Sequence, residues 1–191
     1  AAYNRNPRDI PVLRRKVRRV VERAGFPPQS HDGKALLNIL ETYPRDELFQ
    51  IGEDELYATA IGILLLQQRP RIGVFGRRDE FGRYVSFLVY VPRELYDSQL
   101  RMRIAEVLAA ALNGRVSAFY THLGDDPLAR IHFIVAVESG QATDFDADEI
   151  EARLVAVARS WPDDLHEALL QQDCDEAAEA VGHLIAESTH Q

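Results

Sequence analysis

The chain has 191 residues, of which 46% are hydrophobic and 27% are charged, a composition typical of soluble globular proteins. Its longest apolar run is about half of the roughly 18 residues that a membrane span needs, and its single cysteine, Cys174, excludes an internal disulfide. We therefore expect a globular protein of the reducing cytoplasm, with one core and appended helices or two small domains.

Charge is distributed unevenly along the chain. Residues 1–34 carry nine basic and three acidic side chains, whereas residues 138–191 carry two basic and fourteen acidic ones. Such asymmetry is typical of partner surfaces, and it equally allows the two ends of one chain to attract each other. The chain begins with Ala1, and its only methionine is Met102. We expect a segment of a longer polypeptide, with a processed mature chain as the alternative.

The first quarter of the chain predicts helices. Asp9 is a candidate N-cap for a helix over 10–24, which has one apolar stripe, a face rich in arginine, and a stop signal at Gly25. A second helix is expected over 32–42, and Pro44 ends it. The residues 48–51 that follow are expected to form a short strand.

From residue 52 onward, helix and strand patterns follow one another regularly. A helix over 52–69 precedes strands at 71–78 and 83–91, which are joined by a hairpin loop at 79–82. A helix over 97–113 then precedes strands at 116–123 and 129–137. With the strand at 48–51, this order is the split βαβ arrangement of ferredoxin-like folds. The fold class is therefore α+β, with two helices on one face of an antiparallel sheet and further helices flanking it.

Alternation along the strands distinguishes the two faces of this sheet. One set of positions is uniformly apolar and is expected to meet the helices; in the strand at 83–91 it consists of Val85, Phe87, Val89 and Val91. The other face is half apolar, which a solvated sheet face would not be. Its large side chains include Tyr84, Leu88, Tyr90 and Ile134. We expect these four to form an interface, covered either by a partner domain or by the appended helices.

Three segments of the chain form long, contiguous motifs. They read Tyr-Pro-Arg-Asp-Glu-Leu-Phe-Gln-Ile at 43–51, Arg-Arg-Asp-Glu-Phe-Gly-Arg-Tyr-Val-Ser-Phe-Leu-Val-Tyr-Val-Pro-Arg at 77–93, and Asp-Asp-Pro-Leu-Ala-Arg-Ile-His-Phe-Ile-Val at 125–135. In this order and spacing they resemble the amino-terminal, non-catalytic region of the large bacterial NAD-specific glutamate dehydrogenases. The resemblance runs from about Asn6 past Trp161, and it implies ACT-like domains.

The residue patterns and the resemblance together predict three parts. They are a basic helical segment at 1–44, an ACT-like βαββαβ(β) domain at 45–140, and an acidic helical segment at 141–191 that starts a following module. The resemblance implies that the complete polypeptide converts L-glutamate, water and NAD to 2-oxoglutarate, ammonium and NADH. This segment would then contact other domains and subunits of the same enzyme in a homo-oligomer and contribute a regulatory role.

The sequence shows no catalytic machinery for that reaction. Gly73 and Gly76 lie within a predicted strand and lack the G-x-G-x-x-G spacing of a dinucleotide loop. The only lysines, Lys16 and Lys34, belong to the amino-terminal helices. We therefore expect no cofactor in this segment, with NAD bound in the parent catalytic domain, and no turnover by the segment alone.

The histidines do not predict a metal site. His122 and His132 flank one turn together with Asp125 and Asp126, but their spacing matches no established set of ligands. We expect both to be surface histidines and no metal to be bound. The same expectation holds for the residues of the acidic helices that bear such groups, namely His166, Cys174 and His183.

An amino-acid effector is the ligand that the resemblance implies. In ACT-like folds such effectors typically sit where the first strand meets the first helix, where backbone N–H groups receive a carboxylate. The matching positions are Ile51, Gly52, Glu53 and Asp54. Their acidic side chains would repel a carboxylate but can receive an ammonium group, and the same residues also make a good helix start. Arg77 and Arg78 are expected to be solvated or to pair with the acidic tail.

Two other roles remain open for the segment. One is a purely structural interaction module with no ligand. The other is a ferredoxin-like sheet that binds RNA, suggested by the basic helix at 10–24 and the aromatic strand at 83–90. Tyr84 stands where that strand motif has glycine, and residues 35–137 carry a net charge of −2, so we expect no nucleic-acid partner.

Overall fold

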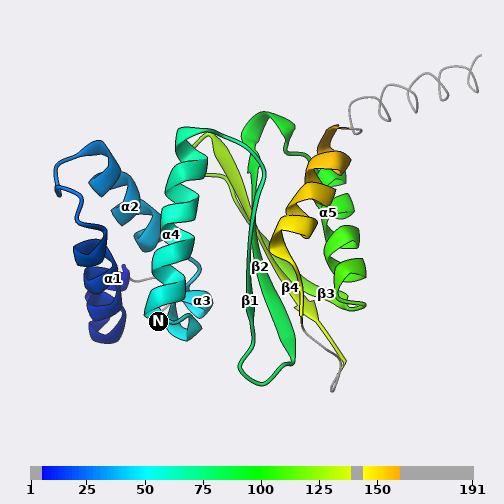
Figure 1. Cartoon of the computed structure of the whole chain (residues 1–191), viewed down its shortest axis with the longest axis horizontal. Helices are drawn as coiled ribbons and strands as arrows, with labels where there is room; N and C mark the ends of the chain where they lie inside the picture. The colour runs from blue at the N-terminus through cyan, green and yellow to red at the C-terminus, as the bar shows by residue number, and fades with distance from the viewer. Residues whose placement is uncertain (1–5, 139–143, 160–191) are drawn as a thin grey trace, which may run out of the picture.

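The computed structural model describes residues 6–138 and 144–159. These residues form an α+β fold in which helices lie on both faces of a four-stranded sheet (Figure 1). The helices are η2 (Pro7–Asp9), α1 (Pro11–Ala24), α2 (His31–Thr42), α3 (Arg45–Gln50), α4 (Glu53–Gln68), η3 (Arg93–Leu95), α5 (Ser98–Ala111) and a helix over 147–159. The strands are β1 (Gly73–Arg78), β2 (Tyr84–Pro92), β3 (Arg115–His122) and β4 (Leu128–Ala136).

Helix α1 begins differently from the prediction and ends as predicted. Its N-cap residue is Ile10, whose side chain makes no capping hydrogen bond. Pro11 occupies the first turn, where a backbone N–H would have no acceptor within the helix, so the missing N–H of proline is tolerated. The predicted cap, Asp9, instead belongs to η2. At the other end Gly25 adopts a left-handed conformation with φ of 67°, which ends the helix at the expected place.

The strand predicted at 48–51 is wrong. Leu48 to Gln50 belong to helix α3, whose Leu48 is fully buried. The short helix is enclosed between Pro44, which is its N-cap, and Gly52, which is the N-cap of α4. The apolar run at 48–51 is too short for its periodicity to distinguish a helix from a strand. Leu48 packs into the core formed by α1, α2 and α4, and these tertiary contacts stabilise the helical conformation.

The sheet is fully antiparallel and has the strand order β1-β2-β4-β3. Two hairpins, β1–β2 and β3–β4, join along the long central pairing of β2 with β4, where Phe87 lies opposite Phe133. A bulge between Val116 and Ala118 interrupts the β3–β4 ladder. The order ββαββα results when the first strand and helix of a βαββαβ unit are moved to its end. The expected fold class is therefore confirmed without a strand before α4.

One face of the sheet packs against α5 and the helix 147–159. The predicted apolar set of β2 lies there, and Phe87 and Phe133 are fully buried beside Ile104 of α5 and Leu154 of the second helix. These two helices stand together on one side of the sheet (Figure 1). The expectation of two helices on one face is confirmed, although one of them is not the helix predicted at 52–69.

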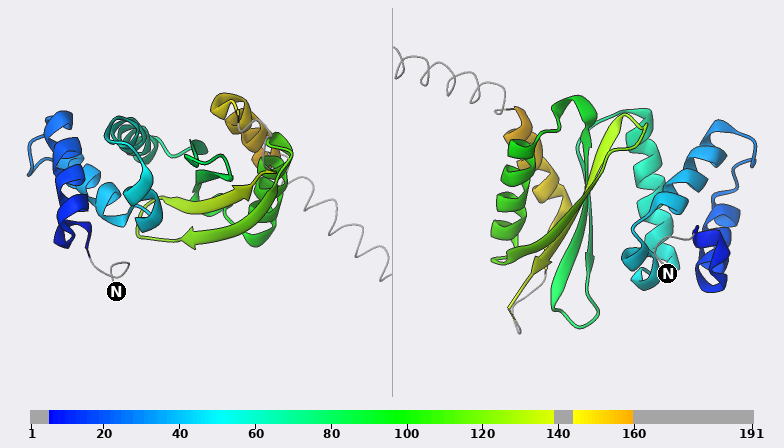
Figure 2. Two further views of the ribbon diagram at one scale, coloured as in Figure 1. Left: turned by 90° about the horizontal axis from the view of Figure 1, so that it is seen from below. Right: turned by 180° about the vertical axis from the view of Figure 1, so that it is seen from behind.

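The other face of the sheet packs against α4, with α1 and α2 behind it (Figure 1 and Figure 2). Leu88 of β2 and Leu128 of β4 share a buried cluster with Leu56 and Ile63 of α4. Helices α4 and α5 therefore lie on opposite faces, and the expectation that both cover the same face is wrong. The half-apolar face did require a cover, and helices of this chain supply it.

The start of the acidic segment is tied to the edge of the sheet. Arg78 of β1 pairs with Asp144, with 2.7 Å between Nη1 and Oδ1, and Arg71 pairs with Glu151. Phe145 packs edge-to-face on Phe87 with 5.0 Å between ring centroids. Of the two open possibilities for Arg78, pairing with the acidic segment is the one observed. Residues 160–191 of the predicted acidic helical segment lie outside the described residues.

Candidate functional site

The candidate functional features of the described chain lie where helices contact one another and where they contact the sheet. The first is a contact between α1 and the segment that joins α3 to α4. Lys16 donates hydrogen bonds from Nζ to the carbonyl oxygens of Leu48 at 2.8 Å and Ile51 at 2.7 Å. Burial lowers the pKa of Lys16, against the opposing attraction of Glu53. One lysine therefore fixes α1 to the end of α3, where exposed carbonyl groups need donors.

The predicted effector residues take part in the same contact. Glu53 accepts a hydrogen bond from Arg19 at 2.8 Å, and Asp54 accepts one from Arg23 at 2.5 Å. Gly52 is the N-cap of α4, and Ile51 is buried with its carbonyl bonded to Lys16. The structure thus brings the four residues together, and it pairs the carboxylates that an effector's ammonium group would need with the basic face of α1.

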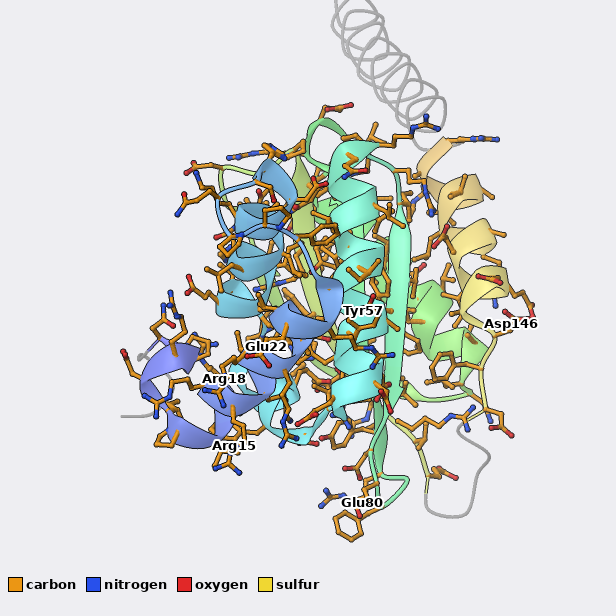
Figure 3. All side chains as sticks on the ribbon, turned by 60° about the vertical axis from the view of Figure 1, so that its left-hand side comes forward. Arg15, Arg18, Glu22, Tyr57, Glu80 and Asp146 are labelled. Carbon is orange, nitrogen blue, oxygen red and sulfur yellow. The ribbon has the colours of Figure 1, made fainter. Side chains whose placement is uncertain are left out.

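The outer side of α1 remains in solvent. Figure 3 shows Arg15 and Arg18 on this side, away from Tyr57 of α4. Arg18 pairs with Glu22 one helical turn later, at 3.7 Å, with both side chains about two-thirds exposed. Arg23 instead stacks over the Tyr57 ring, 4.1 Å from its centroid. The basic face is therefore divided between docking on α4 and exposure to water.

A buried ion pair connects helix α3 to strand β1. The Arg77 guanidinium donates to both carboxylate oxygens of Glu47, at 2.7 Å from Nε and 3.0 Å from Nη2. The side chains are only 10% and 4% exposed. Arg77 also reaches Gln50, whose side chain accepts a second hydrogen bond from the Tyr84 hydroxyl at 2.8 Å. A two-pronged pair with so little solvent access fixes the helix on the strand in one orientation.

Two further polar side chains lie beside this pair on the sheet. Ser86 Oγ and His132 Nε2 are 2.8 Å apart, and both residues are buried. The same nitrogen lies 3.7 Å from Glu47, a contact too long for a hydrogen bond. His132 is therefore part of a buried polar cluster, defined as Glu47, Arg77, Ser86 and His132. The expectation of a surface histidine at this position is wrong.

The polar cluster has the residue types of a hydrolase triad but not its geometry. A triad histidine contacts the serine through one ring nitrogen and the carboxylate through the other. Here Ser86 and Glu47 both approach Nε2 of His132. Ser86 is also only 1% exposed, so no substrate carbonyl can reach its oxygen. The arrangement joins elements together and is not suited to acyl transfer.

The electrostatics of the cluster favour the charged pair. Burial alone would raise the pKa of Glu47, but the interactions with His132, Arg77 and Ser86 outweigh it and lower that pKa to about 2. Burial likewise opposes the charge on Arg77, and the Glu47 carboxylate reverses this and raises the pKa of Arg77. Each group keeps its charge because the other is present, which is the expected behaviour of a well-bonded buried pair.

The lowered pKa of Glu47 predicts a loss of stability in acid. A carboxyl group whose pKa falls from 4.5 to about 2 on folding stabilises the protein above pH 4.5, and this contribution disappears as the pH drops towards 2. The expected loss of unfolding free energy is about 3 kcal/mol. Urea denaturation at several pH values should show it for the parent chain and not for Glu47→Gln. Parallel pH profiles for the two proteins would contradict this assignment.

The predicted interface residues lie under the helical cover or at its margin. Leu88 and Tyr90 are 2% and 6% exposed, and Tyr90 packs edge-to-face on Phe75 with centroids 6.0 Å apart. Burial raises the pKa of the Tyr90 hydroxyl to about 12. Tyr84 and Ile134 are half-buried. Tyr90, an aromatic side chain on which an RNA base would stack, is therefore covered.

The other candidate residues are more dispersed. His122 lies opposite Arg130 and not opposite His132, so the two histidines are not direct cross-strand neighbours. Within residues 6–138 and 144–159, no three His, Cys, Asp or Glu side chains form a group that could hold a metal ion. In the same part of the chain, no helix is long and apolar enough to cross a membrane. His166, Cys174 and His183 lie outside it.

The contact between the helices α1 to α4 and the sheet is called the junction below. Comparison with known proteins identifies the part of the chain on each side of it. Residues 10–69 match the model of glutamate dehydrogenase helical motif 1, which corresponds to α1 to α4. Residues 73–162 match the model of the glutamate dehydrogenase ACT2 domain, which begins with β1. The polar cluster therefore joins a residue of the helical motif, Glu47, to three residues of the ACT2 domain.

Proteins named NAD-specific glutamate dehydrogenase are similar over most of this chain. The one from Halomonas elongata is 44% identical over 92% of the chain, and the one from Pseudomonas aeruginosa is 39% identical over 93%. The one from Mycobacterium tuberculosis is 32% identical over 86%. The chain spans 11% of the length of each. It belongs to the family of large bacterial NAD-specific glutamate dehydrogenases, as a segment of the amino-terminal region that contains helical motif 1 and the ACT2 domain.

Proposed function

We propose that this chain is a non-catalytic regulatory and assembly segment of a larger glutamate dehydrogenase. The complete enzyme would oxidise L-glutamate with NAD and water to 2-oxoglutarate, ammonium and NADH, with NAD bound outside this segment. The segment would contact other domains and subunits of a homo-oligomer. This proposal rests on membership of the family and on the small share of the relatives' length that the chain spans.

The observation that carries the proposal is the way the helical motif is fixed on the ACT2 sheet. The Glu47–Arg77 pair and a continuous apolar cluster hold the helices on the sheet, and Lys16 holds α1 on the other helices. The helices and the sheet therefore form one body. Such a body is suited to transmit a displacement of the helices to the sheet, because buried ion pairs tolerate few alternative geometries. The same contacts support a second candidate, a purely structural module that binds no ligand.

The proposal is tested in the complete enzyme with a substitution that loosens this junction. Glu47→Ala should alter subunit assembly, measured by mass photometry, and should alter the response of activity to amino acids. Glu80→Ala is the matched control, because Glu80 is exposed at the tip of the β1–β2 hairpin (Figure 3). The 191-residue chain by itself should reduce no NAD in the presence of glutamate. Parental assembly and kinetics in the Glu47 variant would contradict the proposal.

A further inference from the structure

The outer side of α1 carries positive charge that the junction does not use. Arg14, Arg15 and Arg18 are exposed there, and we call these three the outer arginines. In the part of the chain that the structure describes, the side chains of Arg14 and Arg15 make no hydrogen bond or ion pair. Arg18 pairs at 3.7 Å with Glu22, the single acidic residue of α1, and exposed pairs of this kind are weak. The outer arginines are therefore open to a partner.

The spacing of the outer arginines is unfavourable for a helix in isolation. Arg14 and Arg18 are four residues apart, and Arg15 and Arg18 are three apart, so like charges lie one turn from each other. Pairs of like charge at these spacings destabilise a helix. The arginines on the inner side of α1 differ, because carboxylates of α4 pair with them. An anionic partner would remove the repulsion on the outer side in the same way.

The end of the chain has the complementary composition. Residues 160–191 carry eight acidic side chains and no lysine or arginine. Two acidic residues before them pair with the edge of the sheet, Asp144 with Arg78 and Glu151 with Arg71. The charges of residues 160–191 have no such counterpart within their own segment. Opposite charges on two surfaces favour their association and reject wrong partners.

The positions of the two regions distinguish contact within one chain from contact between copies. The helix 147–159, after which the acidic residues follow, lies at the opposite end of the molecule from α1 (Figure 1 and Figure 2). The sheet and α4 stand between them. At about 10 Å for each packed layer, the path to α1 of the same chain exceeds about 30 Å. About ten residues would be held extended to cover it, which costs conformational entropy. The α1 of a second copy requires no such linker.

We propose that the outer arginines of α1 bind residues 160–191 of a second copy of this chain. The contact is head-to-tail, because each copy presents its basic helix at one end and its acidic residues at the other. Two basic ends or two acidic ends repel each other, so the head-to-tail arrangement is favoured. Contacts of this kind join copies into a closed ring or an open filament. The inference rests on the proposed assembly function and gives it a surface and a partner.

Sedimentation velocity of the 191-residue chain tests this contact. The chain should associate with rising concentration at about 0.1 M sodium chloride and dissociate at about 1 M, since the screening length falls from about 10 Å to about 3 Å. Replacing the outer arginines together, as Arg14→Gln, Arg15→Gln and Arg18→Gln, should weaken association at least about tenfold, because three exposed ion pairs are lost. The helix should remain folded, since glutamine is a good helix former and the like-charge repulsion is removed.

The matched control changes the net charge by the same amount at other exposed positions. It combines Arg69→Gln at the C-cap of α4, Arg115→Gln in β3 and Arg153→Gln in the helix 147–159. This variant should associate as the parent chain does. A difference between the two triple variants then reports the location of the charges and not the self-repulsion of a more acidic chain.

Mixing two variants gives a signature that a folding defect would not produce. A variant of the acidic residues, with Asp173→Asn, Asp175→Asn, Glu176→Gln and Glu179→Gln, should also fail to associate by itself. Mixed with the outer-arginine variant, it should form heterodimers, because its α1 is intact and the other variant keeps its acidic residues. A contact within one chain would not give this recovery.

Four results would overturn the inference. They are a chain that stays monomeric at all salt concentrations, an equal loss of association in the control, mixed variants that stay monomeric, and a monomeric chain whose outer arginines bind a labelled single-stranded RNA. In the last case the partner would be a nucleic acid. If the inference fails while Glu47→Ala still alters assembly of the complete enzyme, the proposed function stands without this contact. If that variant also has no effect, both fail.

Discussion

A Glu47→Ala variant of this chain is expected to unfold with a free energy about 3–5 kcal/mol below that of the parent, because removing one member of a buried pair leaves the other charge without compensation. Arg77 would lose its two hydrogen bonds from Nε and Nη2 while remaining almost excluded from solvent. Urea denaturation followed by circular dichroism measures this difference. Glu80→Ala, at the exposed hairpin tip, should change stability by less than about 0.5 kcal/mol.

A double substitution separates the charge effect from the loss of packing. Glu47→Leu combined with Arg77→Met removes both charges and keeps apolar volume in the junction. It should be less destabilised than either single variant, since neither partner is then left buried and unpaired. A double variant whose loss equals the sum of the two single losses would show that the carboxylate and the guanidinium do not interact in solution.

The second large effect is expected from the opposite face of the sheet. Phe87→Ala should lower the free energy of unfolding by about 3–5 kcal/mol, because the removed ring leaves a cavity that its neighbours cannot fill completely. Phe87 is fully buried, lies opposite Phe133 on β4, and packs against Phe145. It also lies opposite Gly76, where an added Cβ would come within 2.8 Å of the Phe87 ring.

A matched control for this substitution is available in the neighbouring hairpin loop. Phe81 is 74% exposed, so Phe81→Ala removes the same ring from water and not from the core. Its effect should remain within about 0.5 kcal/mol. Similar losses for Phe81→Ala and Phe87→Ala would mean that the face bearing Phe87 is not the packed face of the sheet.

The strands and their faces could be predicted because alternation is a local property. The four apolar positions of β2 from Val85 to Val91 share one face, and each of them is buried under α5 and the helix 147–159. Asp97, the first residue of the helix predicted over 97–113, caps α5 by accepting a hydrogen bond from the Leu100 N–H at 2.7 Å. Patterns with a period of two residues, and caps within one helical turn, are visible without knowledge of the tertiary fold.

The position of α4 could not be predicted in the same way. Its apolar residues surround most of the helix, since it packs against the sheet on one side and against α1 and α2 on the other. A helix that is apolar on several sides gives no indication of which sheet face it covers. The wrong prediction of a strand at 48–51 has a related cause. The expected βαββαβ order begins with a strand before its first helix, and 48–51 is the segment predicted to be that strand.

The buried polar cluster was missed because its members are distant in sequence. Glu47 precedes the apolar Leu48, and His132 lies in a strand whose alternate residues are polar, so each by itself is typical of a surface position. One signal was available. By strand alternation, Ser86 and His132 share the sheet face of Leu88 and Ile134, which needed a cover, and polar groups under a cover require partners.

The central claim is that the helical motif and the ACT2 sheet form one cooperative unit joined through Glu47 and Arg77. Amide hydrogen exchange of the 191-residue chain, followed by mass spectrometry at increasing urea concentrations, tests it most directly. Peptides from α1, α2 and α4 should lose protection at the same urea concentration as peptides from β1, β2 and β4. Loss of protection in the helices while the sheet stays protected would contradict the claim, because the helical motif would then open independently.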